Sequence, residues 1–376
     1  MIPRLIAASL WQRIIDSTKI IIVYGPRQVG KTTLVGELIN SLPYRSLSIN
    51  ADELLYQTVL SSRDLSKMKL LVDGFDLLFI DEAQRIPDIG INLKILHDAL
   101  PALKIIATGS SSFELANRTK EALTGRTWTY ELFPISVGEL GLQQNSFLVQ
   151  QRLEELLIFG SYPDTLQQPN EADKIRYLRE LSSAYLYKDV LEMASIRHAD
   201  KLRKLLQLLA HQVGAEVSLN ELGNTLGMSK DTVSTYIDLL EKAFVVFRLS
   251  GFSRNLRKEV SKMNKIYFYD LGIRNVLIDN FRPLDLRTDV GGLWENFLVV
   301  ERRKRNVYLN QFASAYFWRT YTGAELDYVE EANDQLTGFE FKFTRKTARI
   351  PASWLENYPE AGFQVVNREN FWPFLS

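Results

Sequence analysis

The sequence contains no cysteine, which excludes a disulfide framework, a thiolate metal site and a cysteine nucleophile. It has no low-complexity tract, and its longest apolar runs are far shorter than the roughly 18 residues that a membrane helix needs. The first residues, MIPRLIAASLWQR, have too short an apolar stretch for a signal peptide and are better interpreted as an amphipathic helix. We therefore expect a cytoplasmic protein without a membrane partner.

The sequence also has no excess of charge, because 45 basic residues balance 45 acidic ones. A net charge of zero gives no bulk electrostatic argument for nucleic-acid binding. Basic residues nevertheless cluster at 248–265, 302–305 and 342–349, all in the C-terminal half. Such clusters are often only solvated faces, so a nucleic-acid contact and a solvated face both stay open as interpretations. With 376 residues, of which 46% are hydrophobic, the chain has room for two to four domains.

The strongest motif lies in the stretch KIIIVYGPRQVGKTTL at residues 19–34. Gly25, Gly30, Lys31 and Thr32 have the GxxxxGK[ST] spacing of a P-loop, between an apolar β-branched run and a helix-compatible run. Such a loop directs backbone N–H groups and a helix N-terminus at phosphate oxygens. The alternative is a glycine-containing turn before a surface helix. The predicted ATP-binding residues are Gly25, Pro26, Arg27, Gln28, Val29, Gly30, Lys31, Thr32 and Thr33.

A second motif, DLLFIDEAQR at residues 76–85, is a continuous apolar run that ends in two acidic residues. Such a run is typical of a strand that is buried on both faces of a parallel sheet. Following a P-loop by about 50 residues, it predicts that Asp81 and the Thr32 hydroxyl hold Mg²⁺ and that Glu82 polarises the attacking water. Lys31 is expected to reach the β- and γ-phosphates.

A third predicted strand, at residues 103–107, ends in a run of small polar residues. Ser110 is the candidate for sensing the γ-phosphate there, and a simple strand-ending turn is the alternative. Arg118 and Arg126 are candidates for an arginine finger, in cis or across a subunit contact. Arg126 is preferred because it follows a glycine before a predicted strand, although either arginine can be a surface ion-pair partner.

The segment 150–211 has helical spacing of apolar residues, with a break at Tyr162-Pro163, and predicts a helical connector. Residues 218–249 then predict a helix-turn-helix, with caps at Ser218 and Ser229 and a wing strand at 245–249. The second helix of such a motif enters the major groove of DNA in nucleic-acid readers. Its expected exposed residues, Lys230, Asp231 and Thr235, are not strongly basic, so a protein-contact module is an equal alternative.

A second constellation lies near the C-terminus. The helix predicted at 292–305 presents Glu295, and a β meander that follows carries Asp327, Glu340 and Lys342. Residues two apart on a strand share a face, so Glu340 and Lys342 project together, and Asp327 faces Glu340 if the strands are antiparallel neighbours. Two carboxylates and a lysine can hold a divalent metal and activate water. The alternative is an amphipathic hairpin with solvated charges.

The combined motifs resemble a known family over nearly the whole chain, the prokaryotic AAA-like P-loop ATPases, related to the STAND group, that carry a C-terminal domain of unknown function. The resemblance implies a winged helix followed by a fold similar to PD-(D/E)XK nucleases. It further implies that Asp327, Glu340 and Lys342 occupy the D…ExK positions and Glu295 the helical acidic position. The stretches that carry it are GPRQVGKTTL, LLFIDEAQRIP, ATGSSSFEL, LTGRTWTYELFPIS, KIYFYDLGIRN, WENFLVVE, YFWRTYTGAELDYV and FEFKF.

These inferences predict an α/β protein with four parts: a P-loop ATPase domain with a parallel sheet at 1–150, a helical lid or connector at 151–210, a winged helix at 211–275 and a nuclease-like domain at 276–376. ATP and Mg²⁺ are the expected ligands. In one hypothesis, ATP gates a C-terminal module that cuts or grips DNA. In the other, the chain is a nucleotide-dependent switch or scaffold whose inactive nuclease-like domain binds protein partners or a further copy of the chain.

Overall fold

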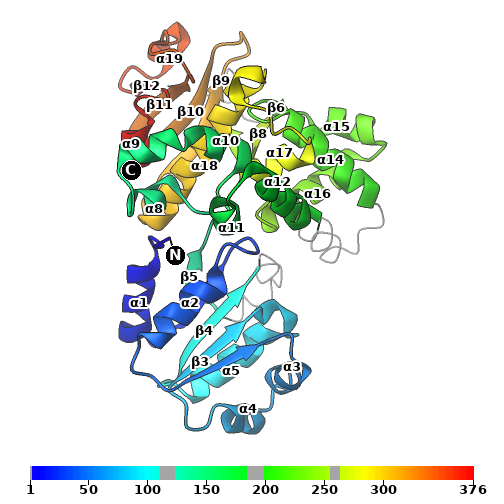
Figure 1. Cartoon of the computed structure of the whole chain (residues 1–376), viewed down its shortest axis with the longest axis vertical. Coiled ribbons are helices and arrows are strands. Elements are labelled where there is room, and N and C mark those ends of the chain that lie inside the picture. Colours follow the sequence, from blue (N-terminus) through cyan, green and yellow to red (C-terminus); the bar gives the residue numbers. More distant parts are fainter. Residues whose placement is uncertain (1, 111–122, 184–198, 255–262) are drawn as a thin grey trace. The chain divides into compact units, whose positions relative to one another are not determined.

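The computed structural model describes residues 2–110, 123–183, 199–254 and 263–376. The chain forms two compact units (Figure 1). The first unit comprises residues 3–133 and 242–244, and the second unit comprises residues 134–241 and 245–376 with the first two residues. Among the described residues, no helix is both long and apolar enough to cross a membrane.

The first unit is built on a five-stranded parallel sheet in the order β2-β3-β4-β1-β5. The first four residues of β1 and of β3 are apolar and buried, as the continuous hydrophobic runs predict. β4 confirms the third strand predicted at residues 103–107 and lies between β1 and β3. The strands are β1 (Ile20–Tyr24), β2 (Ser46–Asn50), β3 (Leu77–Asp81), β4 (Lys104–Gly109) and β5 (Thr127–Glu131).

Helices pack on this sheet and bury a core that includes side chains of β1, β3, β4 and α5. The amphipathic N-terminal helix is confirmed as α1, which buries Leu10 and Ile14. Figure 1 shows α5 beside β3 and β4, with α3 and α4 connecting β2 to β3. The helices are α1 (Ala7–Asp16), α2 (Lys31–Asn40), α3 (Leu54–Leu60), α4 (Leu65–Leu71), α5 (Ile89–Ala99) and the 3₁₀ turn η1 (Ala83–Arg85).

The second unit contains a seven-stranded mixed sheet in the order β12-β11-β10-β9-β7-β8-β6. β11 and β12 are parallel, and so are β7 and β9, while the remaining neighbours are antiparallel. The strands are β6 (Glu216–Val217), β7 (Val246–Gly251), β8 (Asn264–Phe268), β9 (Ser314–Arg319), β10 (Glu325–Ala332), β11 (Gln335–Phe341) and β12 (Gly362–Val366).

The helices of the second unit confirm the helical pattern predicted for residues 150–211 in its described part, including the break before Pro163. Asp270 caps α17, the helix that follows β8, where its carboxylate accepts a hydrogen bond from the Ile273 N–H. The helices are α8 (Val137–Gly141), α9 (Ser146–Gln151), α10 (Leu153–Phe159), α11 (Pro163–Gln167), α12 (Glu171–Leu181), α14 (Ala199–His211), α15 (Leu219–Leu226), α16 (Lys230–Lys242), α17 (Leu271–Leu277), α18 (Val290–Tyr308), α19 (Ala352–Asn357) and α20 (Phe371–Leu375).

The predicted pair of helices at 218–242 is present as α15 and α16. The Ser218 hydroxyl accepts a hydrogen bond from the Glu221 N–H at the start of α15, and Gly227 ends that helix with a φ of 59°. Lys230, Asp231 and Thr235 on α16 are exposed, as expected. The acidic residues Asp238 and Glu241 on the same helix bind Arg248 of β7. The helix thus offers a face of mixed charge.

The parallel pairing of β7 with β9 joins the segment that contains α15 and α16 to the C-terminal β meander in one sheet. This pairing crosses the boundary predicted at 275/276, because β7 precedes it and β9 follows it. The four-part division into separate domains stays a prediction.

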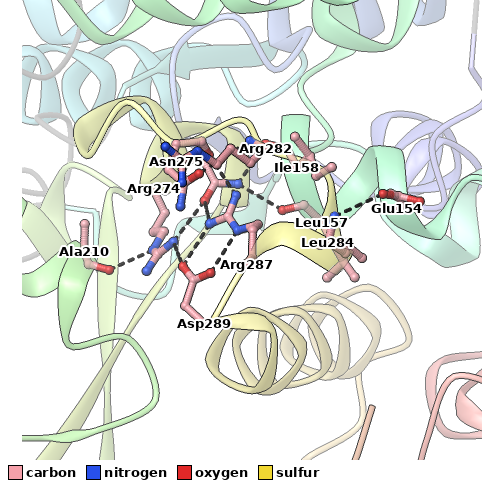
Figure 2. A network of polar contacts seen from close by, with 11 residues as sticks. Glu154, Leu157, Ile158, Ala210, Arg274, Asn275, Arg282, Leu284, Arg287 and Asp289 are labelled. Atoms are coloured by element: carbon pink, nitrogen blue, oxygen red, sulfur yellow. Dashed lines mark hydrogen bonds and ion pairs between the residues drawn. The ribbon is translucent and has the colours of Figure 1, made fainter. Parts of the chain in front are cut away.

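A buried polar network connects α10, α14 and α17 with the start of α18 (Figure 2). Arg274 donates a hydrogen bond from Nε to the Ala210 carbonyl at 2.7 Å and forms an ion pair with Asp289 at 2.5 Å. Asn275 donates from Nδ2 to two carbonyls at the end of α10, and Arg287 donates to Asp289 at 2.8 Å. The DLGIRN stretch is therefore used to hold helices together.

Candidate functional site

The P-loop connects the end of β1 to the start of α2, and its two glycines are required by the local backbone. Gly25 has a φ of 152° and lies so close to the Leu132 carbonyl that an added Cβ would be 2.0 Å from its oxygen. Gly30 has a φ of 92° and precedes the first residue of α2. The loop can therefore follow a path that other residues would obstruct, and its helix N-terminus provides the N–H groups that bind anions.

Lys31 is buried at the base of this loop, with an exposed fraction of 5%. Its Nζ donates hydrogen bonds to the carbonyls of Gly25 at 2.9 Å and Pro26 at 2.7 Å. Burial lowers the pKa of Lys31 to about 8, although the carboxylates of Glu82 and Asp81 act in the opposite direction. A buried ammonium group with no carboxylate bonded to it is suited to accept an anionic ligand.

Thr32 and Asp81 meet where β3 ends beside the start of α2. The Thr32 hydroxyl donates to the Asp81 carboxylate, with distances of 3.0 Å to Oδ1 and 2.9 Å to Oδ2. Thr108, at the end of β4, also donates to Asp81 Oδ1. A hydroxyl and a carboxylate so close together are the hard oxygen donors that Mg²⁺ prefers, so these residues fit the predicted ion.

Glu82 follows Asp81 directly and has a left-handed backbone conformation, with a φ of 54°. Among the neighbouring charges, that of Glu82 has the largest effect on the pKa of Lys31, so the two side chains lie near one another. Gln84, in the 3₁₀ turn η1, donates from Nε2 to Glu82 Oε2. The structure therefore brings together Lys31, Thr32, Asp81 and Glu82, which the sequence predicts as one site.

The remaining residues predicted for the ATP site, Ser110 and the two arginines, are not all near the P-loop. Ser110 follows β4 and is buried. Arg126 precedes β5, and its carbonyl accepts a hydrogen bond from the N–H of Ile20, the first residue of β1. Because the strands are parallel, Arg126 lies at the sheet edge opposite the P-loop, where it binds Asp98 at 2.8 Å. The prediction of a finger in cis is therefore wrong for Arg126. Its action across a subunit contact stays a prediction, and Arg118 lies outside the described residues.

Three residues of this site were missed by the sequence analysis. Arg4 donates hydrogen bonds to the carbonyls of Val29, in the P-loop, and Phe133, each at 2.6 Å, and so supports the loop from outside. Thr108 and Gln84 bind the two acidic residues. A polar residue at the end of β4 signalled Thr108, but Ser110 was preferred two positions later. Arg4 is remote in sequence and gave no signal.

A second polar cluster lies on α18, β8, β10 and the end of β11 in the second unit. Tyr328 pairs with Phe339 in the antiparallel β10–β11 register, so Asp327 is directly opposite Glu340, as predicted. Asp327 accepts a hydrogen bond from the Phe341 N–H at 2.7 Å, and Lys342 forms an ion pair with Glu340 at 2.6 Å. Burial is the main cause of the raised pKa values of Asp327 and Glu340.

Glu295 of α18 faces the same cluster but has a cation of its own. Lys265 of β8 binds its Oε1 at 2.7 Å, and the Tyr267 hydroxyl donates to the same oxygen at 2.7 Å. Burial raises the pKa of Glu295 to about 7 even though Lys265 opposes the shift, and the charge of Asp327 raises it further. The mutual influence of Lys265, Glu295 and Asp327 on their pKa values indicates that they lie close together.

This cluster does not have the arrangement of a metal centre with several protein ligands. Across the described ranges, no three histidine, cysteine, aspartate or glutamate side chains are grouped so that they could hold a metal ion. The predicted metal ligands Asp327 and Glu340 are opposite one another, while Glu295 is paired with Lys265 and Glu340 with Lys342. No pattern in the sequence points to Lys265 as part of this cluster.

Comparison with protein-family models identifies three segments of the chain. Residues 17–141 match an AAA domain, which contains the P-loop and the Asp81-Glu82 pair. Residues 150–284 match a domain of unknown function, DUF8612, and residues 290–371 match another, DUF4143. The second polar cluster draws Glu295, Asp327, Glu340 and Lys342 from the DUF4143 segment and Lys265 from the DUF8612 segment.

The chain is similar along most of its length to curated proteins whose functions are not described. It is 30% identical to the uncharacterized protein Rv2008c of Mycobacterium tuberculosis, covering 92% of this chain and 75% of the relative. It is 27% identical to the uncharacterized protein MJ1544 of Methanocaldococcus jannaschii, covering 78% and 68%. Among solved structures, the Walker-type ATPase PABY2304 of Pyrococcus abyssi is similar with a TM-score of 0.49 and 16% identity, over 72% of this chain and 94% of that one. The chain belongs to the family of the mycobacterial protein, with an AAA domain that carries the P-loop and a C-terminal DUF4143 domain.

Proposed function

We propose that this chain binds ATP with Mg²⁺ at the P-loop and hydrolyses it. The observation that carries the proposal is the meeting of a buried lysine, a threonine hydroxyl and two adjacent carboxylates at one edge of a parallel sheet. These are the groups that phosphoryl transfer requires, because it depends mainly on positioning and on stabilising charge. The match to an AAA domain over the same residues supports the proposal.

Each residue has a separate role in this proposal. The N–H groups of residues 25–33 and the Lys31 ammonium bind the phosphates, and Thr32 and Asp81 hold the metal ion. When bound, Mg²⁺ neutralises charge between the β- and γ-phosphates. The Glu82 carboxylate takes a proton from the attacking water, whose oxygen forms the new bond to the γ-phosphorus. The bond from that phosphorus to the bridging oxygen breaks, and ADP and phosphate are released.

Two substitutions test this proposal on the full chain. Lys31→Ala removes the buried ammonium, so ATP binding measured by calorimetry is expected to fall below detection. Glu82→Gln retains the shape of the side chain but removes the base, so the protein is expected to bind ATP and to hydrolyse it about 100-fold more slowly. Lys67→Ala, which alters an exposed ion pair on α4, is the matched control. Full ATPase activity in the Lys31 variant would refute the assignment.

For the second unit, we propose a nuclease-like fold next to a winged helix. The order α18, β9, β10, β11, α19 and β12, with β12 parallel to β11, supports the nuclease-like fold, as does the placement of Asp327 opposite Glu340. α15, α16 and β7 support the winged helix. Both assignments also rest on the family resemblance of the sequence.

Two hypotheses follow for the role of the second unit. In the first, ATP gates metal-dependent action on DNA, which the intact set of Asp327, Glu340 and Lys342 favours. In the second, the unit binds a protein partner without cutting DNA. We favour the second because lysines already compensate Glu295 and Glu340 and because α16 carries several acidic residues.

Plasmid and linear DNA incubated with the full chain and Mg²⁺ or Mn²⁺ distinguish the two hypotheses. Absence of cleavage, with or without ATP, is expected in the second hypothesis. Metal-dependent cleavage that disappears in Glu340→Ala would support the first. Asp334→Ala, at the turn of the same hairpin, is the control for nonspecific loss of the fold.

A further inference from the structure

We propose that Gln84 is a further catalytic residue of the ATP site, and this inference rests on the proposed ATP hydrolysis. Its amide N–H holds Glu82, and its carbonyl oxygen accepts a hydrogen bond from the attacking water. The two side chains together then fix the water against the γ-phosphate.

The first observation is the contact between the two side chains. Gln84 Nε2 donates to Glu82 Oε2 across the 3₁₀ turn that follows β3. Among the described residues, no hydrogen bond reaches the other carboxylate oxygen, Oε1. Glu82 therefore has one oxygen fixed by an amide and one oxygen available to take a proton.

The second observation is the other end of the same amide group. Gln84 Oε1 is buried and has no hydrogen-bond partner among the residues that the structure describes. A buried carbonyl oxygen without a partner is costly and requires an explanation. A role as acceptor for the attacking water explains this oxygen, because a water that gives one hydrogen to Glu82 has a second hydrogen to donate.

The third observation is that the turn holds both groups in place. Glu82 has a left-handed backbone conformation, the Arg85 N–H donates to the Glu82 carbonyl at 2.9 Å, and Ala83 between them is fully buried. The charge of Glu82 also raises the pKa of Lys31, so the Glu82 carboxylate lies near the P-loop lysine. Gln84 is thus held near the base within one short turn, because only Ala83 separates the two residues in sequence.

In the resulting step, the water oxygen attacks the γ-phosphorus while one hydrogen points to Gln84 Oε1. The other proton passes to Glu82 Oε1, and the electron pair of the breaking bond remains on the oxygen of ADP. The Gln84 amide is unchanged by the reaction. Its function is to hold the base and the water in one orientation, which lowers the entropic barrier of the step.

The decisive experiment measures kcat, KM and ATP affinity of the full chain with Gln84→Ala. We expect kcat to fall about 10- to 100-fold, with ATP affinity changed less than twofold. The matched control is Gln12→Ala, since Gln12 also donates from Nε2 to a carboxylate, Asp16 Oδ2 at 2.5 Å, on the exposed face of α1. The control is expected to retain the kcat of the unaltered chain.

Gln84→Glu separates the catalytic role from a structural one. A carboxyl group at position 84 can donate a hydrogen bond to Glu82 only while it carries a proton. The kcat of the Gln84→Glu variant, relative to that of the unaltered chain, is therefore expected to fall as pH rises from 5 to 8. On a Glu82→Gln background, Gln84→Ala is expected to add less than a twofold loss because the two residues act as a unit.

The outcomes are distinguishable. If the unaltered chain hydrolyses ATP and Gln84→Ala retains its kcat, the inference about Gln84 is wrong while the proposed function stands. Equal losses in kcat and ATP affinity, without the pH dependence of Gln84→Glu, would show that Gln84 only supports the fold. If the unaltered chain does not hydrolyse ATP at all, the proposed function fails first.

Discussion

Asp81 and Glu82 in the first unit accept hydrogen bonds from uncharged donors, whereas Glu295 and Glu340 in the second unit are each paired with a lysine. Thr32, Thr108 and Gln84 are the donors in the first unit. Lys265 and Lys342 are the cations in the second unit. Both clusters lie at the ends of strands or on the helix next to them, and both contain adjacent carboxylates.

The difference shows what each cluster is prepared to bind. A hydroxyl or an amide can turn toward another oxygen when a metal ion approaches, so the negative charge of Asp81 stays available to a cation. A lysine already supplies the positive charge in the second unit. Displacing that lysine would leave a buried carboxylate without its counter-ion, which costs free energy. The same residue types therefore predict ion binding in the first unit and a self-compensated cluster in the second.

The largest expected effect concerns the metal ligand of the first unit. Asp81→Asn removes the charge that holds Mg²⁺ while retaining the size of the side chain, so kcat for ATP is expected to fall at least about 100-fold. Glu340→Gln, the equivalent change in the second unit, is expected to leave kcat within twofold. Steady-state phosphate release at several Mg²⁺ concentrations measures both. Equal losses in the two variants would contradict the comparison.

A smaller effect is expected on the stability of the second unit. Lys265→Met leaves Glu295 buried without its cation, so the free energy of unfolding is expected to fall by about 3 kcal/mol. Adding Glu295→Leu should recover most of that loss, because the buried charge is then gone. Denaturant unfolding monitored by tryptophan fluorescence measures the change. Lys346→Met, in an exposed pair of the same 2.7 Å length, is the control and should change stability little.

The smallest effect concerns the pH dependence of ATP binding. Burial lowers the pKa of Lys31 to about 8, so the ammonium form that binds phosphate is lost as pH rises through that value. The dissociation constant for ATP is therefore expected to increase about tenfold between pH 7 and pH 9. Titration with a fluorescent ATP analogue measures it. Lys31→Arg stays charged throughout this range and should show a flat profile.

Much of the first unit could be predicted because its signals are local. Continuous apolar runs identified β1 and β3, and the spacing of Gly25, Gly30 and Lys31 identified the loop between β1 and α2. Arg126 was misplaced because the direction of β5 decides which end of that strand meets the P-loop, and direction is a property of the whole sheet. Thr108 was missed since only the alignment of β4 with β3 brings its hydroxyl to Asp81.

In the second unit, the contacts inside the β10–β11 hairpin could be predicted from sequence, but the contacts between distant elements could not. Alternation along the two strands predicted that Asp327 faces Glu340 if the strands are antiparallel neighbours, and β10 and β11 do pair in that way. Lys265 was missed because it precedes Glu295 by 30 residues and reaches it only through the packing of β8 against α18. No periodicity in either element indicates that contact, although it determines the charge of the cluster.

The parallel pairing between β7 and β9 has a practical consequence for work on this family. The two strands pair with Ser250 opposite Tyr316 and Gly251 opposite Phe317, inside a sheet that continues on both sides. A fragment cut between them would expose a strand edge with unpaired N–H and C=O groups and would tend to self-associate. Expression of the second unit should therefore retain the chain from residue 134 onward in one piece. A swap of modules between relatives should exchange that segment as a whole.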